Sequence, residues 1–167
     1  MLAALGDLVE DVIVRLDGPV NVASDTHATI SRRRGGSAAN VAARAASLGH
    51  RARFLGQVGS DAIGTALIAE LTDDGVDASM VRRGGSTGTI VALVDHRGER
   101  SMLTDRRACL DLGHPDPSWL DGASTLHVPF YSLATGTIAT TSSTVIGWAR
   151  ERGVAVSIDV SSTAIMH

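Results

Sequence analysis

The sequence contains no lysine, because all 15 of its basic residues are arginine. A P-loop, a protein-kinase active site, a Schiff-base enzyme and a pyridoxal-phosphate anchor each need a lysine at a defined position. The composition therefore excludes all four classes.

Aromatic residues are also scarce, at two Phe, one Tyr and two Trp, and the formal net charge is −3. A nucleic-acid surface needs basic charge to bind phosphates and, for single strands, aromatic rings on which bases stack. We therefore expect no nucleic-acid partner.

Cys109 is the single cysteine, so we expect no internal disulfide and no cysteine-based zinc site. This cysteine usage favours a reducing, cytoplasmic compartment. Acidic residues interrupt the apolar N-terminal stretch, unlike a signal peptide, and no apolar run approaches the ~20 residues that span a bilayer. We expect no membrane association, and the spacing of the six histidines indicates no metal site.

Apolar runs and glycines predict alternating strands and helices in one domain. Strands are expected at 2–5, around 12–14, and at 53–56, 126–128 and 154–159, the last of them buried. Helices are expected at 37–48, with Val41, Ala45 and Leu48 on one face, from Asp61 to Gly75, and at 144–152. Two further extended runs, 89–94 and 99–103, are joined by a glycine-containing turn. The order favours a three-layer α/β/α core with an added antiparallel patch.

The segment from Gly35 to Asn40 combines two glycines with the start of a helix. Glycines allow a ligand to approach the backbone, and a helix start presents free N–H groups. Asn40 offers both a donor and an acceptor to a ligand hydroxyl. Asp11, placed at the end of the first strand, is expected to accept hydrogen bonds from a polyol. A purely structural glycine turn is the alternative, and the glycine spacing disfavours a dinucleotide-binding site.

Together with the segment Gly56 to Gly64, the Gly35–Asn40 segment resembles the first signature of the ribokinase-like (PfkB) carbohydrate kinases. The resemblance extends over essentially the whole chain. It implies a ribokinase-like α/β/α core with a small antiparallel β lid formed by residues 12–34 and 87–105. It also implies that Asp11, Gly35, Gly36 and Asn40 bind substrate hydroxyls. Arg106 is similar to the arginine of a substrate-contacting loop, in which Arg107 stands where the family usually has glycine.

The family implies ATP-dependent phosphorylation of a sugar or related polyol, with Mg²⁺ as a further cofactor and a sugar as the small-molecule partner. The second family signature, a Gly-Ala-Gly-Asp-like segment with the catalytic base, does not occur in these 167 residues. We therefore expect residues 1–167 to be the N-terminal part of a kinase domain, inactive alone, with no catalytic residue and no bound ATP or Mg²⁺. A non-catalytic sugar-binding or oligomer-forming fragment is the alternative, since lid strands can pair into a homodimer.

Overall fold

The central sheet is parallel and has the strand order β10-β9-β1-β4. The structure is a computed structural model that describes residues 1–160. The four strands are β1 (Leu2–Leu5), β4 (Ala52–Leu55), β9 (Thr125–Pro129) and β10 (Ala155–Asp159). The strands predicted at these places are confirmed.

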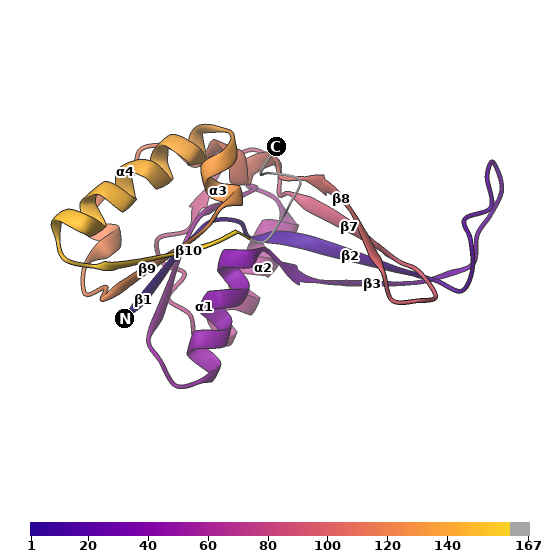
Figure 1. The fold of residues 1–167 in the computed structure, drawn as a ribbon, viewed down its shortest axis with the longest axis horizontal. Coiled ribbons are helices and arrows are strands. Elements are labelled where there is room, and N and C mark those ends of the chain that lie inside the picture. The colour runs from indigo at the N-terminus through magenta and orange to yellow at the C-terminus, as the bar shows by residue number, and fades with distance from the viewer. Residues whose placement is uncertain (161–167) are drawn as a thin grey trace.

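Helices cover both faces of this sheet (Figure 1). One face packs on α1 (Ser37–Ser47) and α2 (Ala62–Asp73), and the other on α4 (Thr137–Glu151) and the short helix η2 (Pro117–Leu120). Strand β1 shows why: Ala3 and Leu5 point into one cluster and Ala4 into the other, as the two-residue period of a strand requires. The three-layer α/β/α core is therefore confirmed.

A second sheet projects from the core, in the order β3-β2-β7-β8 (Figure 1). It comprises β2 (Val9–Leu16), β3 (Ala28–Gly35), β7 (Thr89–Val94) and β8 (Arg100–Asp105). We refer to it as the lid sheet. Its two outer pairings are antiparallel, but β2 and β7 pair in parallel, because both strands leave the core in the same direction. The expected antiparallel patch is thus a mixed sheet. A short parallel pair is formed by β5 (Gln57–Val58), which precedes α2 in the chain, and β6 (Arg82–Arg83), which follows it.

The buried face of α1 differs from the predicted one. Alanines at positions 38, 39 and 42 are fully buried, whereas Leu48 follows the helix and is 60% exposed. Small side chains let the helix lie close to the sheet, so the alanines, and not the larger residues, form the contact. The predicted stop at Gly49 is confirmed by its φ of 82°.

The last helix and strand also depart from expectation. Helix α4 begins at Thr137, seven residues before the predicted start at 144. Serine and threonine dominate its first half and favour helix poorly, but Ile138, Thr141 and Val145 are buried at helical spacing. Strand β10, predicted as buried, is largely exposed because it lies at the edge of the sheet.

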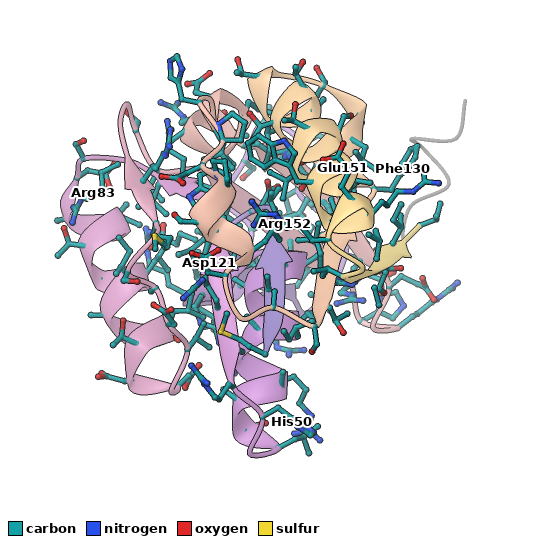
Figure 2. All side chains as sticks on the ribbon, turned by 90° about the vertical axis from the view of Figure 1, so that its left-hand side faces the viewer. His50, Arg83, Asp121, Phe130, Glu151 and Arg152 are labelled. Atoms are coloured by element: carbon teal, nitrogen blue, oxygen red, sulfur yellow. The ribbon has the colours of Figure 1, made fainter. Side chains whose placement is uncertain are left out.

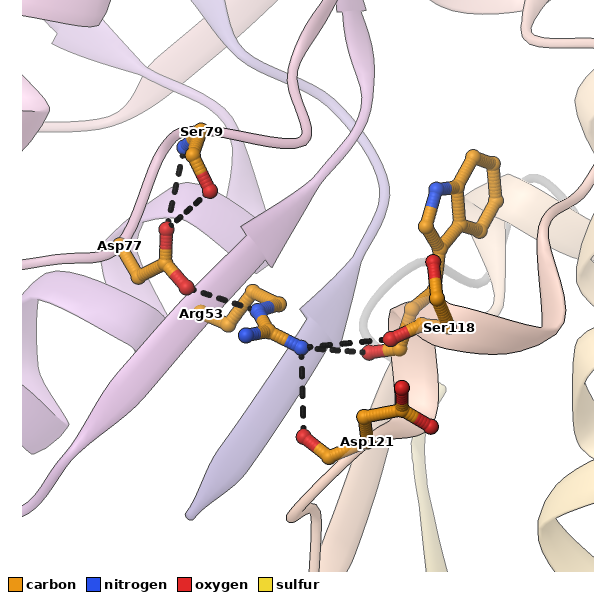
Figure 3. Close-up of polar contacts among 6 residues, drawn as sticks. Arg53, Asp77, Ser79, Ser118 and Asp121 are labelled. Atoms are coloured by element: carbon orange, nitrogen blue, oxygen red, sulfur yellow. Dashed lines mark hydrogen bonds and ion pairs between the residues drawn. The ribbon is translucent and has the colours of Figure 1, made fainter.

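Arg53 connects the core sheet to the loop at Asp77 and to the end of η2 (Figure 3). Its Nε donates to Asp77 at 2.8 Å, and its Nη1 lies 3.3–3.5 Å from the carbonyl oxygens at the end of η2, those of residues 118, 119 and 121. Arg152, at the end of α4, donates to the Pro117 carbonyl and lies near Asp121 (Figure 2). The two arginines therefore hold the η2 loop against the central sheet and the end of α4. None of the helices within residues 1–160 has the length and apolar character that crossing a membrane requires.

Candidate functional site

A cavity of about 600 Å³ lies where the lid sheet meets α1 and the end of β9. Its walls come from the start of α1, the inner face of the lid sheet and the junction between β9 and α3 (Tyr131–Ala134). Of the five expected site residues, four line it and the fifth, Gly35, lies directly beneath Asp11. The lining residues are Asp7, Asp11, Gly36, Ser37, Asn40, Val41, Arg44, Ile90, Arg100, Met102, Thr104, Arg106, Pro129, Tyr131 and Ser132.

The two glycines are required by close approaches within the site. A Cβ at position 35 would overlap the Asp11 carboxylate, and one at position 36 would overlap the Asp7 carbonyl. Gly36 also has φ of 103°, a conformation that other residues rarely adopt. It precedes α1 and provides no side-chain cap, so the first-turn N–H groups of the helix remain available to a ligand.

Asp11 lies inside β2, the first lid strand, and not at the end of β1 as the sequence suggested. Its Oδ1 is buried and has no hydrogen-bond partner within residues 1–160. Burial raises the pKa of this carboxyl group. An unpartnered buried acceptor costs free energy unless a ligand or water satisfies it, so Asp11 is suited to accept a hydrogen bond from a ligand hydroxyl.

Asn40 is oriented by Arg34, the second-last residue of β3. The Nη1 group of Arg34 donates to Asn40 Oδ1 at 3.2 Å, and its Nη2 donates to Asp74 at 2.8 Å. Because the side-chain oxygen of Asn40 is held in this way, its Nδ2 group is the part that is free to donate to a ligand.

Arg106 forms a two-pronged ion pair with Asp7, at 2.6 and 2.8 Å. Both side chains are nearly buried. Burial alone would lower the pKa of Arg106, but the hydrogen bonds and charge of Asp7 outweigh that effect and raise it. Asp7 is not predictable from the sequence, because its contact with Arg106 spans 99 residues of chain and leaves no local pattern.

The neighbours of Arg106 are structural. Arg107 has φ of 40°, in the left-handed region that favours glycine, and pairs with Asp105 at 2.6 Å. Cys109 is fully buried, and burial raises the pKa of its thiol to about 12. The thiol is therefore not a nucleophile at neutral pH. In the part of the chain that the structure describes, no three His, Cys, Asp or Glu side chains are grouped to hold a metal ion.

Comparisons with known proteins show the family to which the chain belongs. The sequence pattern of the pfkB family carbohydrate kinases matches residues 1–159. The chain belongs to this family. Among curated members, a fructokinase from Escherichia coli is 30% identical over 160 residues, which are 93% of this chain and 48% of that protein. A fructosamine kinase from Bacillus subtilis is 31% identical over 105 residues, 59% of this chain and 37% of that protein.

Solved structures of pfkB kinases share the fold. A fructokinase from Halothermothrix orenii superposes with a TM-score of 0.83 at 24% identity, covering 95% of this chain and 56% of that one. A sugar kinase from Pyrococcus horikoshii in complex with ATP superposes with a TM-score of 0.85 at 24% identity, covering 98% and 54%. The pfkB chain described here thus spans about half the length of these relatives.

Proposed function

We propose that this chain provides the sugar-binding half and the lid of an ATP-dependent sugar kinase. The observation that carries this proposal is that Asp11, whose Oδ1 is buried and unpartnered within residues 1–160, lines the same cavity as Asn40. An acceptor and a donor that line one cavity match the hydroxyl groups of a sugar, each of which both donates and accepts. The curated relatives include fructokinases and a fructosamine kinase, so fructose is the first substrate to test.

Each site residue has a separate task in this proposal. Asp11 accepts a hydrogen bond from one hydroxyl, and Asn40 donates to another. Gly36 lets the sugar reach the free N–H groups at the start of α1. The lid sheet covers the sugar and excludes water, which would otherwise compete with the sugar hydroxyl for the phosphoryl group.

ATP is the proposed phosphate donor, supported by the ATP complex of the Pyrococcus horikoshii sugar kinase. The carboxylates at the cavity do not fit a role in binding Mg²⁺. Both carboxylate oxygens of Asp7 accept hydrogen bonds from Arg106, and Asp11 is a single half-buried carboxyl group whose pKa burial raises. We therefore assign neither ATP nor Mg²⁺ to residues 1–160 and derive no catalytic step from them.

The 167 residues assayed alone are expected to bind sugar without transferring phosphate. A general base contributes about 10²–10⁴-fold to the rate of a reaction. Asp7 is paired with Arg106 and Asp11 is assigned to a sugar hydroxyl, so neither cavity carboxylate is available as that base. We propose a cytoplasmic location, because a reducing compartment keeps the single thiol of Cys109 reduced.

A homodimer through the lid is a further part of the proposal. The strand register places Val12, Val91 and Leu103 in one row on the outer face of the lid sheet, with Arg32 at its edge, followed by Val14, Ile30 and Leu93, with Ser101 at the other edge. Ile30 and Leu103 are 63% and 58% exposed. An apolar sheet face of this kind is typical of a protein interface. Sedimentation of wild type and Leu103→Asp tests it: a dimer that the substitution dissociates is expected, and a monomeric wild type would contradict it.

Calorimetric titration with fructose tests the sugar site. Asp11→Ala and Asn40→Ala should each weaken binding by roughly 1–3 kcal/mol, because each leaves a ligand hydroxyl unpaired. Asp73→Ala and Asn21→Ala are matched controls, since neither residue lines the cavity. Unchanged fructose affinity in both site variants, or a loss that affects ATP alone, would contradict the proposal.

A further inference from the structure

Two arginines on opposite walls of the cavity have no acidic partner within residues 1–160. They are Arg44, on α1, and Arg100, at the start of β8. Both residues are exposed. Arg106 differs from them, because Asp7 balances its charge. The charged residues of the lining are three arginines and two aspartates, so the cavity has a formal excess of one positive charge.

The position of Arg44 follows from the helical period. Ser37, Asn40, Val41 and Arg44 line the cavity at the spacing of one helix face. Four residues separate Asn40 from Arg44, which is about 6 Å along the helix axis. The arginine thus lies one turn beyond the amide that we assign to a sugar hydroxyl.

The position of Arg100 follows from the strand register. Arg33, Asp11, Ile90 and Thr104 form the inner row of the lid sheet, next to the core, and the last three line the cavity. Residues 15, 94 and 100 form the outer row on the same face, which carries two arginines and one valine. Four residues of β8 separate the two rows, or about 13 Å along the strand. Both walls therefore change from hydroxyl-binding groups near the core to arginine at the mouth.

The surface between the two ends is apolar. Val41 and Met102 line it, with Ile90 of the inner row next to them, and none of these side chains offers a strong hydrogen bond. The volume of about 600 Å³ lies within the range of roughly 300–1,000 Å³ that is typical of pockets for drug-sized ligands. The cavity has room for a sugar with a substituent.

From this arrangement we propose that the substrate is a sugar derivative with an anionic group, a carboxylate or a phosphate, that binds between Arg44 and Arg100. The sugar hydroxyls occupy the inner end at Asp11 and Asn40, and the substituent extends along the apolar wall. Arginine suits this task because its planar guanidinium binds both carboxylate and phosphate through paired hydrogen bonds. The inference rests on the proposed sugar site and adds the class of sugar.

The test is calorimetric titration of the whole chain with a matched series of ligands: fructose, N-fructosylglycine, fructose 1-phosphate and fructose 6-phosphate, with glycine and inorganic phosphate as fragments. At least one anionic sugar is expected to bind roughly 10- to 100-fold more tightly than fructose, the gain expected of a hydrogen bond to a charged group. Comparing N-fructosylglycine with the two sugar phosphates distinguishes recognition of a carboxylate from recognition of a phosphate. Comparing fructose 1-phosphate with fructose 6-phosphate shows at which end of the sugar the anionic group is bound.

Arg44→Gln and Arg100→Gln should remove most of that advantage and leave fructose affinity unchanged. Arg150→Gln, an exposed arginine of α4 outside the cavity, is the matched control and should have no effect. The advantage should also shrink as salt concentration rises, because the two arginines are open to solvent.

Three results would overturn the inference. If fructose binds as tightly as every anionic derivative, the charge recognition is wrong while the sugar site stands. If no sugar binds at all, the proposed function fails and the inference fails with it. If the two variants change the affinity for ATP and not for the anionic sugars, the arginines serve the nucleotide.

Discussion

The carboxylate of Asp11 occupies the space that a side chain at residue 35 would need. A Cβ on Gly35 would overlap all three terminal atoms of Asp11. The two residues lie on neighbouring lid strands, β2 and β3, so the glycine is what allows a carboxylate to point into the cavity. Gly35 therefore contributes to the site without lining it.

Gly35→Ala should weaken fructose binding and lower the free energy of unfolding by roughly 1–3 kcal/mol, the usual cost of overpacking. Denaturant titration and calorimetry measure the two effects. Gly147→Ala is the control. Gly147 lies within α4 and a Cβ there would meet no neighbouring atom, so alanine should stabilise the protein by roughly 0.5–1 kcal/mol. In an Asp11→Ala background, the cost of Gly35→Ala should largely vanish. A cost that is the same in both backgrounds would contradict the steric explanation.

Asp11→Asn should raise stability at pH 7 while weakening sugar binding. Burial raises the pKa of Asp11, so the folded protein binds this proton more tightly than the unfolded chain. Stability is consequently lost as pH rises through the folded pKa. The variant should be more stable than wild type at neutral pH, and the gap should close below the unfolded pKa of about 3.9. Thermal unfolding from pH 3 to 8 measures it, and a gap that is constant with pH would contradict the prediction.

Local patterns in the sequence predicted most of the elements and four of the cavity residues. The cap at Asp61, the stop at Gly49 and the turn before β8 each depend on a few adjacent residues, and each is confirmed. The parallel pairing of β2 with β7 and the contact of Asp7 with Arg106 join distant parts of the chain. Such contacts depend on the three-dimensional path and leave no periodic signal.

Two predictions from the sequence are wrong for a reason other than distance along the chain. The helical periodicity predicts that Val41, Ala45 and Leu48 form the buried face of α1, whereas close packing on the sheet buries Ala38, Ala39 and Ala42. The first half of α4 has poor helix propensity but is stabilised by tertiary contacts, including a hydrogen bond of 2.7 Å from Thr141 to the Leu112 carbonyl. The helix propensity and hydrophobicity of one segment do not reveal its contacts with other segments.

Cys109 should resist thiol reagents in the folded protein. Its sulfur is fully buried and lies 3.5 Å from the Leu8 carbonyl oxygen. Burial raises the pKa of the thiol to about 12, so little thiolate exists at pH 8. Reaction with a chromogenic disulfide at pH 8 should be slow in buffer and immediate in denaturant. Labelling of the native protein at the rate of a free thiol would contradict both the burial and the raised pKa.

Asp61 links the lid sheet to the core through hydrogen bonds, and its substitution should increase local opening at the start of β7. Its carboxylate accepts hydrogen bonds from the backbone of Gly64, at the start of α2, and from both the backbone and the hydroxyl of Thr87, two residues before β7. The Thr87 hydroxyl in turn accepts from the backbone N–H of Gly59 at 3.1 Å. One carboxylate therefore joins the helix cap to the entry of the lid strand.

Asp61→Ala should cost about 1–2 kcal/mol of stability from the lost cap alone, and it should raise hydrogen exchange at the amides of β7. Asp61→Asn keeps an acceptor and should restore most of the stability, and Asp73→Ala, at the exposed end of α2, is the control. Hydrogen bonds from the Thr87 side chain and backbone and from Gly64 lower the pKa of Asp61, so its contribution is present above the unfolded pKa of about 3.9 and is lost as pH falls through the lower folded value. The stability difference between wild type and Asp61→Asn should therefore shrink in acid. Exchange at β7 that is the same in wild type and Asp61→Ala would show that Asp61 caps α2 without anchoring the lid.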